Sequence, residues 1–422
     1  MSQADNSSRR EFQRSVLPNG LTVLSEHMPG VRSVSFGAWV RAASVHENPE
    51  RMGVSHLLEH MVFKGTERRS AKQIALELEA LGGSLDAYTS REHTVYQARV
   101  LDEHLPQAAD VIADIVFRPL LRSSDLALER KVVLEEIAMV EDTPDDLVFE
   151  LHNEALWGAH PYGHSILGTR ETVKQLSVKA LKELHGRAYH PPQLVVAASG
   201  NVEHQALLDV LERTGWTGMP RGEESLLAPP DGRTDAPVVR HVDREGTQTH
   251  IVLGSAGLRY ADPRRYALVM LSMLLGGGMS SRLFQRVREE LGLAYSVYTF
   301  QQFYADTGMH GVYVATSPES ARAAYDVIRE ELAQVAASGL PRDEIEMGKS
   351  QLKGQMTLSL ESVGARMYRA AAVELYGEPY RTLDETLALV EAVTVDDIAA
   401  VAHEFFAPDK QTVLSLGPSQ LA

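Results

Sequence analysis

Two histidines and a glutamate stand close together near the N-terminus, in the stretch GVSHLLEHMVFKGT at residues 53–66. His56 and His60 are four residues apart, and Glu59 directly precedes the second histidine. On a helix these positions share one face, so the three side chains would project together. Two imidazoles one turn apart can bind zinc, and H-x-x-E-H is a metallohydrolase arrangement in which the glutamate is the base. The alternative is a surface helix with two solvated histidines.

A catalytic zinc site needs a third protein ligand, and the stretch LERKVVLEEIAMVED at residues 128–142 offers candidates. The helix-face neighbours of Glu136 are three valines, namely Val132, Val133 and Val140. Glu135 instead neighbours Lys131 and Met139, so Glu136 is predicted to be the inward carboxylate and the third metal ligand. Glu129 lies two turns earlier on the same face and is predicted to support the ligands by hydrogen bonding.

The two halves of the chain look alike when one is shifted by 217 residues. SHLLEH at 55–60 falls on SMLLGG at 272–277, and TVYQA at 94–98 falls on GVYVA at 311–315. A constant offset over this distance indicates a duplicated domain. The second half has no copy of the polar residues, because their counterparts are Met273, Gly276, Gly277 and Lys353.

Alternating and helical patterns place the motifs on regular elements. We expect strands at 20–28 and 33–42, a strand pair within 85–101, and helices at 53–64, 70–83, 105–119 and 123–142. This order predicts an α+β fold of two similar, duplicated domains, each a mainly antiparallel β-sheet covered by α-helices. The Gly- and Pro-rich stretch 217–237 is expected to link a zinc-binding domain at 1–216 to a metal-free domain at 238–422.

Composition excludes several other classes of protein. The chain has 422 residues, no cysteine and a net charge of -16. Disulfides and thiolate ligands are therefore excluded, and nucleic-acid binding is disfavoured because phosphates would be repelled. No apolar run approaches the ~20 residues of a membrane span, and no signal-like stretch opens the sequence, so we expect a cytoplasmic protein without a membrane partner.

With these motifs and the duplication, the sequence resembles the M16 metallopeptidase family, and at this length its short-chain branch of dimeric, two-domain subunits. The resemblance implies a zinc metalloendopeptidase in which His56, His60 and Glu136 hold Zn²⁺ and Glu59 is catalytic. It also gives Glu129 the supporting role. Peptide substrates are expected to bind as an added β-strand. The alternative function is a non-catalytic peptide-binding or structural subunit of a processing-peptidase-like complex.

A second family signature lies in LGGGMSSRLFQRVREELGLAYSVY, where Arg288 and Tyr295 match the family's substrate-binding Arg and Tyr. In long-chain relatives the matching elements belong to the first and last of four similar domains. A two-domain chain can reproduce that arrangement only by pairing, so the resemblance implies a homodimer enclosing a chamber. Asp86 stands where the family often has Asn, and this extra carboxylate could favour basic side chains or alter the pH dependence. Structural roles are expected for His152, His160 and His164.

Overall fold

The computed structural model describes residues 12–222, 234, 236–418 and 420–421, which form two compact units. The first unit comprises Met1–Ile137, His164–Pro230 and Leu358–Thr382, and the second comprises Ala138–Gly163, Asp231–Thr357 and Leu383–Ala422. Each unit therefore takes one segment from the other half of the sequence. The prediction divides the chain once, at 217–237. In the structure, residues 138–163 belong to the second unit and residues 358–382 to the first. Residues 223–233 and 235 of the predicted linker lie outside the described residues.

The first unit is built on a six-stranded sheet with the order β1-β2-β6-β3-β5-β4. Its strands are β1 (Phe12–Val16), β2 (Thr22–His27), β3 (Ser33–Val40), β4 (Ser84–Thr89), β5 (Thr94–Leu101) and β6 (Leu194–Gly200). Its helices are α2 (Val54–Val62), α3 (Ala71–Glu79), α4 (Leu105–Phe117), α5 (Ser123–Asp142, which runs on into the second unit), α7 (Arg170–Gln175), α8 (Val178–Ala188), α9 (His204–Arg213) and α13 (Val363–Leu375). Only β2 and β6 pair in parallel, so β4 is an antiparallel edge strand beside β5.

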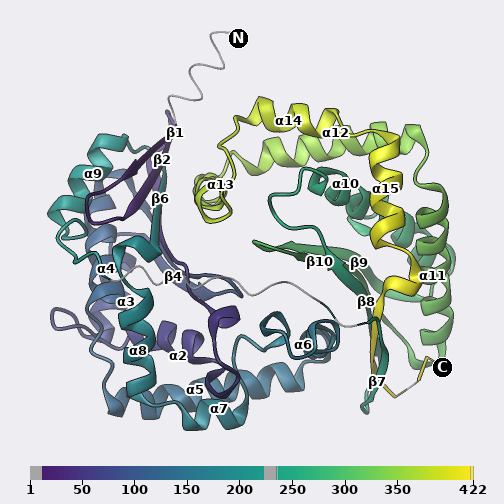
Figure 1. Cartoon of the computed structure of the whole chain (residues 1–422), viewed down its shortest axis with the longest axis horizontal. Coiled ribbons are helices and arrows are strands. Elements are labelled where there is room, and N and C mark those ends of the chain that lie inside the picture. Colours follow the sequence, from purple (N-terminus) through teal and green to yellow (C-terminus); the bar gives the residue numbers. More distant parts are fainter. Residues whose placement is uncertain (1–11, 223–233, 235, 419, 422) are drawn as a thin grey trace. The chain divides into compact units, whose positions relative to one another are not determined.

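Side chains alternate between the two faces of this sheet, and both faces are covered. On β3, Phe36 and Ala38 join the large core that includes α2, α4 and α9, whereas Trp39 points to the opposite face. There it packs against Met367 and Ala370 of α13. The helices of the large core lie along one side of the first sheet in Figure 1. The period of two along the central strands thus buries side chains on both faces of the sheet, whereas edge strand β4 exposes every second residue.

The second unit repeats this plan. Its five-stranded sheet has the order β7-β11-β8-β10-β9, made of β7 (Val239–Asp243), β8 (Thr249–Gly257), β9 (Ala294–Phe303), β10 (Gly308–Thr316) and β11 (Thr412–Gly417). Its helices are α6 (Pro144–Trp157), α10 (Arg265–Gly276), α11 (Ala321–Ser338), α12 (Arg342–Ser359), α14 (Leu383–Glu391) and α15 (Val395–Phe405). Val148 of α6 packs on one face of this sheet, and the core of α10, α11 and α15 covers the other.

The strand order confirms the predicted pair of similar α+β domains. In both sheets one parallel pair, β2/β6 or β7/β11, is followed by three antiparallel neighbours. The shift of 217 residues is nevertheless inexact. Thr94 pairs with Val40, but its shifted counterpart Gly311 pairs with Gly254, which the shift aligns with Gly37. If β5 and β10 keep the offset of 217 residues, β3 and β8 therefore depart from it by three positions.

Helix α2, which carries the histidine pair, begins with an unusual cap. Gly53 has a positive φ of 86°, and a Cβ there would lie 2.5 Å from the Leu167 carbonyl oxygen, so only glycine fits. The buried carboxylate of Glu47 accepts hydrogen bonds from the amides of Gly53 and Ser55, at 2.8 and 2.7 Å. Burial raises the pKa of Glu47 to about 7, against the opposing effect of these donors. A side chain six residues upstream of Gly53 thus satisfies two of the amides at the start of the helix.

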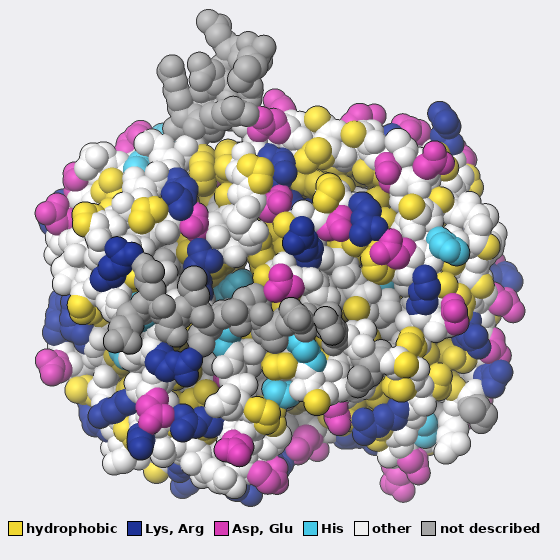
Figure 2. Space-filling model, in the orientation of Figure 1, with side chains coloured by type: hydrophobic (Ala, Val, Ile, Leu, Met, Phe, Trp, Pro, Cys, Tyr) yellow, Lys and Arg dark blue, Asp and Glu magenta, His cyan; other side chains and the backbone are white. Residues whose placement is uncertain are grey.

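Acidic and basic side chains share the molecular surface. Figure 2 shows Lys and Arg interspersed with Asp and Glu over the face in view. Within the described part of the chain, no helix combines the length and apolar character needed to cross a bilayer.

The Glu47 cap gives a prediction about stability. Glu47→Ala leaves two buried amide donors unpaired, which costs about 1–3 kcal/mol. We expect the midpoint of urea-induced unfolding to fall accordingly. Glu50→Ala, which removes an exposed glutamate three residues away, is the matched control and should change stability by no more than about 0.5 kcal/mol. Equal effects of the two substitutions would contradict the capping role.

Candidate functional site

The first two candidate ligands are placed by the burial of their helix. Leu57, Leu58 and Met61 of α2 are completely buried in the first core. Their packing fixes the rotation of the helix and leaves His56 and His60 on another face, with side chains that are 12% and 17% exposed. The two rings lie 4.6 Å apart between centroids, as expected for residues one turn apart.

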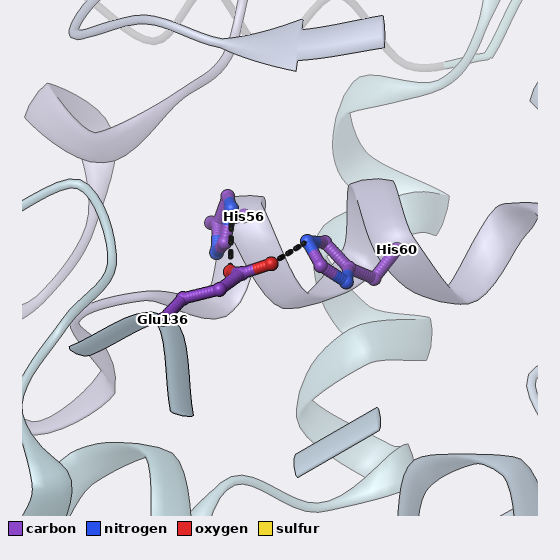
Figure 3. A group of neighbouring side chains, drawn as sticks. All are labelled: His56, His60 and Glu136. Atoms are coloured by element: carbon purple, nitrogen blue, oxygen red, sulfur yellow. Dashed lines mark ion pairs between the residues drawn. The ribbon is translucent and has the colours of Figure 1, made fainter. Parts of the chain in front are cut away.

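The third candidate ligand comes from helix α5. Glu136 directs its carboxylate between the two histidines, as Figure 3 shows. Its oxygens lie 3.7 Å from His56 Nε2 and 3.6 Å from His60 Nε2. One ligand atom from each residue can be chosen so that all lie within 4.8 Å of one another, and across the described ranges no other such group of three potential ligands is found. The structure therefore brings His56, His60 and Glu136 together.

The polar atoms of this group fit a bound cation. The gaps between Glu136 and the histidines are too long for hydrogen bonds. Among the described residues, the buried atoms His56 Nδ1 and Glu136 Oε2 have no hydrogen-bond partner, which is costly in a folded protein. Burial, reinforced by the neighbouring His60, lowers the pKa of His56 to about 4, so this ring is neutral as a metal ligand must be. Two imidazoles and one carboxylate are a donor set that catalytic zinc accepts.

Glu129 supports the site from two turns of α5 further back. Its carboxylate lies 3.2 Å from His60 Nδ1 and 2.7 Å from Lys64 Nζ, and the residue is 6% exposed. If His60 donates Nδ1–H to Glu129, its Nε2 lone pair faces Glu136. Lys64 offsets the buried negative charge and was not predicted from the sequence. Its position four residues after His60 was an available signal, since it places the two on one helix face.

Helix α5 is oriented differently from the predicted pattern. Its buried residues are Leu126, Glu129, Val133 and Ile137. Val132, which was expected on the inward face, is 43% exposed. Glu136 lies at the edge of the buried stripe with a side chain that is 34% exposed, and Glu135 is fully on the outside. The valine-rich surroundings were therefore a poor guide to the inward face, although Glu136 does turn toward α2.

Glu59 lies beside the two histidines and is 9% exposed. Its Oε2 accepts a hydrogen bond of 2.6 Å from the Thr89 hydroxyl. Burial raises the pKa of Glu59, while the Thr89 bond acts in the opposite direction. A carboxylate made more basic by burial is suited to accept a proton. Thr89 was not singled out in the sequence, although the alternation in LDAYT places it on the half-buried side of β4 with Leu85 and Ala87.

The structure pairs Arg288 and Tyr295 within the second unit. Arg288 belongs to a π-helical segment, Phe284–Glu290, and Tyr295 to β9. The guanidinium carbon lies 4.3 Å from the centroid of the Tyr295 ring and 4.7 Å from that of Phe284. Tyr295 is 76% exposed, so it is available for an intermolecular contact and is not a core residue.

The remaining sequence candidates have simple surroundings. Asp86 is exposed on the edge strand β4, and its Oδ1 accepts a hydrogen bond from the Ala87 amide at 2.9 Å. His152 is buried, with Nε2 3.2 Å from the Thr412 carbonyl oxygen. His160 stacks on Tyr162, and the His164 carbonyl oxygen accepts a hydrogen bond from Arg91. None of these three histidines belongs to the ligand group found among the described residues.

Comparison with known proteins gives matches over almost the whole chain. The model of the insulinase domain, peptidase family M16, matches residues 22–170, and that of the peptidase M16 inactive domain matches residues 175–352. An uncharacterized zinc protease of Streptomyces coelicolor is 41% identical over 93% of this chain and 86% of its own length. The uncharacterized zinc protease YmxG of Bacillus subtilis is 39% identical over 97% of this chain and 98% of its own length.

Solved structures share the fold. A peptidase M16 inactive domain from Pseudomonas fluorescens superimposes with a TM-score of 0.90, at 22% identity, over 97% of this chain and 98% of that chain. A protease from Helicobacter pylori superimposes with a TM-score of 0.88, at 21% identity, over 96% and 99% of the two chains. These structural likenesses, at low sequence identity, support the fold. The domain models and the curated relatives match this chain in sequence as well. The chain belongs to peptidase family M16, the insulinase family.

Proposed function

We propose that this chain is a zinc-dependent endopeptidase that hydrolyses unstructured peptides, or processes short peptide segments, within a dimeric chamber. The observation that carries the proposal is the convergence of His56, His60 and Glu136 beside the buried carboxylate of Glu59. The relatives named zinc proteases support the choice of zinc as the metal and of peptide hydrolysis as the reaction. A structural or purely peptide-binding subunit would not need this complete set of residues.

The residues of the chain have separate roles in the proposed reaction. Zinc held by His56, His60 and Glu136 would lower the pKa of water and polarise the scissile carbonyl. Glu59 accepts a proton from the attacking water as the new C–O bond forms. It then delivers that proton to the amine nitrogen as the C–N bond breaks. Glu129 keeps the His60 ring in one orientation through its contact with Nδ1.

Strand β4 is the proposed docking edge for the substrate. It forms the end of the first sheet, and among the strands that the structure describes β5 is its one neighbour. An extended peptide can add to such an edge through backbone hydrogen bonds, which explains a requirement for unstructured substrates. Asp86 and Tyr88 are exposed on this strand and would meet substrate side chains. We propose that the Asp86 carboxylate favours basic side chains at the position that it faces.

The first prediction concerns the base. Glu59→Gln removes the proton acceptor but leaves all three ligands, so the variant should bind zinc as the wild type does and lose at least about 100-fold in peptide turnover. Metal analysis and turnover of an unstructured peptide are measured on the same sample. Turnover near the wild-type level at equal zinc content would show that Glu59 is not the base.

The second prediction concerns the ligand on α5. Glu136→Gln should weaken zinc binding by more than the roughly 10–100-fold that is typical for loss of an outer partner of a ligand. Glu135→Gln is the matched control, because this neighbouring carboxylate is exposed and should leave the affinity unchanged. Competition with a chelator measures both affinities. The opposite order of the two variants would move the third ligand to Glu135.

The third prediction concerns assembly, and it assumes that Arg288 and Tyr295 complete the zinc site of the other subunit in a homodimer. Inactive Glu59→Gln chains are mixed with inactive Tyr295→Phe chains under conditions that exchange subunits. Random exchange makes half of the dimers mixed, and one of the two sites in each mixed dimer is then intact. Activity should therefore return to roughly a quarter of the wild-type level. Demonstrated exchange without any return of activity would exclude this arrangement.

A further inference from the structure

The Glu59 carboxylate is held at one oxygen by a short hydrogen bond. The Thr89 hydroxyl lies 2.6 Å from Glu59 Oε2, within the range of charge-assisted O–H···O bonds. Because the residue is only 9% exposed, water has little room to replace that donor. The loss of a donor to a buried charged group costs more than the loss of an exposed one. The bond therefore restricts the directions in which the carboxylate can point.

The hydroxyl is itself fixed by the strand that carries it. Thr89 is the last residue of β4 and pairs with Thr94 of β5. Its side chain lies on the half-buried side of the strand, while Asp86 and Tyr88 lie on the exposed side. Threonine is branched at Cβ and has few accessible χ1 rotamers in a strand. A paired backbone and a stiff side chain thus aim the hydroxyl at Glu59.

We propose that Thr89 is a positioning residue for the proton transfer, an inference that rests on the proposed function. The Thr89 hydroxyl keeps its own proton and donates to Oε2 throughout. Oε1 of Glu59 is then the oxygen that takes the proton from water and passes it to the leaving amine. Thr89 thereby fixes which oxygen reacts and in which direction it points, and a misdirected base lowers the rate without weakening substrate binding.

The main test is Thr89→Val, which keeps the branched shape and removes the hydroxyl. We expect kcat to fall about 10-fold, a part of the 10²–10⁴-fold that a general base contributes, with KM and zinc content unchanged. Thr89→Ser restores the hydroxyl and should recover most of kcat. Thr89→Ala is a second variant without the hydroxyl and should resemble Thr89→Val.

Thr94→Val is the matched control. Thr94 is the strand partner of Thr89, and its hydroxyl donates to the Ala42 carbonyl oxygen at 3.2 Å. Thr94→Val removes a hydroxyl from the neighbouring strand at the same pair of β4 and β5. If loss of a threonine hydroxyl lowered kcat only by weakening the strand pair, both variants would lose kcat. We expect Thr94→Val to keep the wild-type kcat.

A readout independent of turnover is the crystal structure of the Thr89→Val protein. The Glu59 carboxylate should leave its wild-type position or occupy more than one rotamer. An unchanged carboxylate, a wild-type kcat in Thr89→Val, or a failure of Thr89→Ser to recover kcat would each overturn the positioning role. Failure of the proposed function is distinguishable, because the wild type would then show no zinc-dependent peptide turnover, or Glu59→Gln would turn over peptide as the wild type does. Failure of this inference alone leaves the wild type active and Glu59→Gln inactive.

Discussion

The packing of helix α2 against the first sheet is the interaction on which the site depends. Leu57, Leu58 and Met61 are fully buried, and this burial fixes the rotation of the helix about its axis. A turn of the helix by one residue, about 100°, would bury a histidine and expose a leucine. The position of the helix along its axis is fixed separately, because Gly53 and the Glu47 carboxylate determine where it begins. Hydrophobic burial and one upstream carboxylate together place three polar side chains.

Glu59 and His60 of this helix are tolerated because each meets a partner from another element. Thr89 of β4 donates to Glu59, and Glu129 of α5 lies between His60 and Lys64. Buried charges without such partners would be strongly destabilising. Buried side-chain atoms without a hydrogen-bond partner occur at several places in the described chain, and His56 Nδ1 and Glu136 Oε2 of the proposed ligands are among them. The unpaired Glu136 Oε2 lies between the two histidines, where a cation would supply the missing partner.

Local sequence patterns were sufficient for the helix that carries the histidines and for the strand pairs, because both depend on short periodicities. The helix expected at 70–83 starts directly after Ser70, whose side chain accepts a hydrogen bond from the Gln73 amide. Contacts between elements that are distant in the sequence could not be predicted from local patterns. The bond from Thr89 to Glu59 depends on the pairing of β4 and on its distance from α2, which no local pattern encodes. Val132 was misplaced because an apolar side chain can lie on the exposed edge of a helix that buries only a narrow stripe.

The exchange of segments between the two halves of the chain has a consequence for how the protein can be divided. Helix α13 comes from the second half of the sequence, yet it covers Trp39 and Val195 on the first sheet. Its Arg366 and Arg369 also contact the buried carboxylate of Glu26, at 2.8 and 3.0 Å. A fragment ending near residue 216 would lack this helix, so it would expose an apolar sheet face and leave the Glu26 carboxylate without its two arginine partners. An exposed apolar face favours aggregation, so we expect the first unit to fold only when residues 358–382 are present with it.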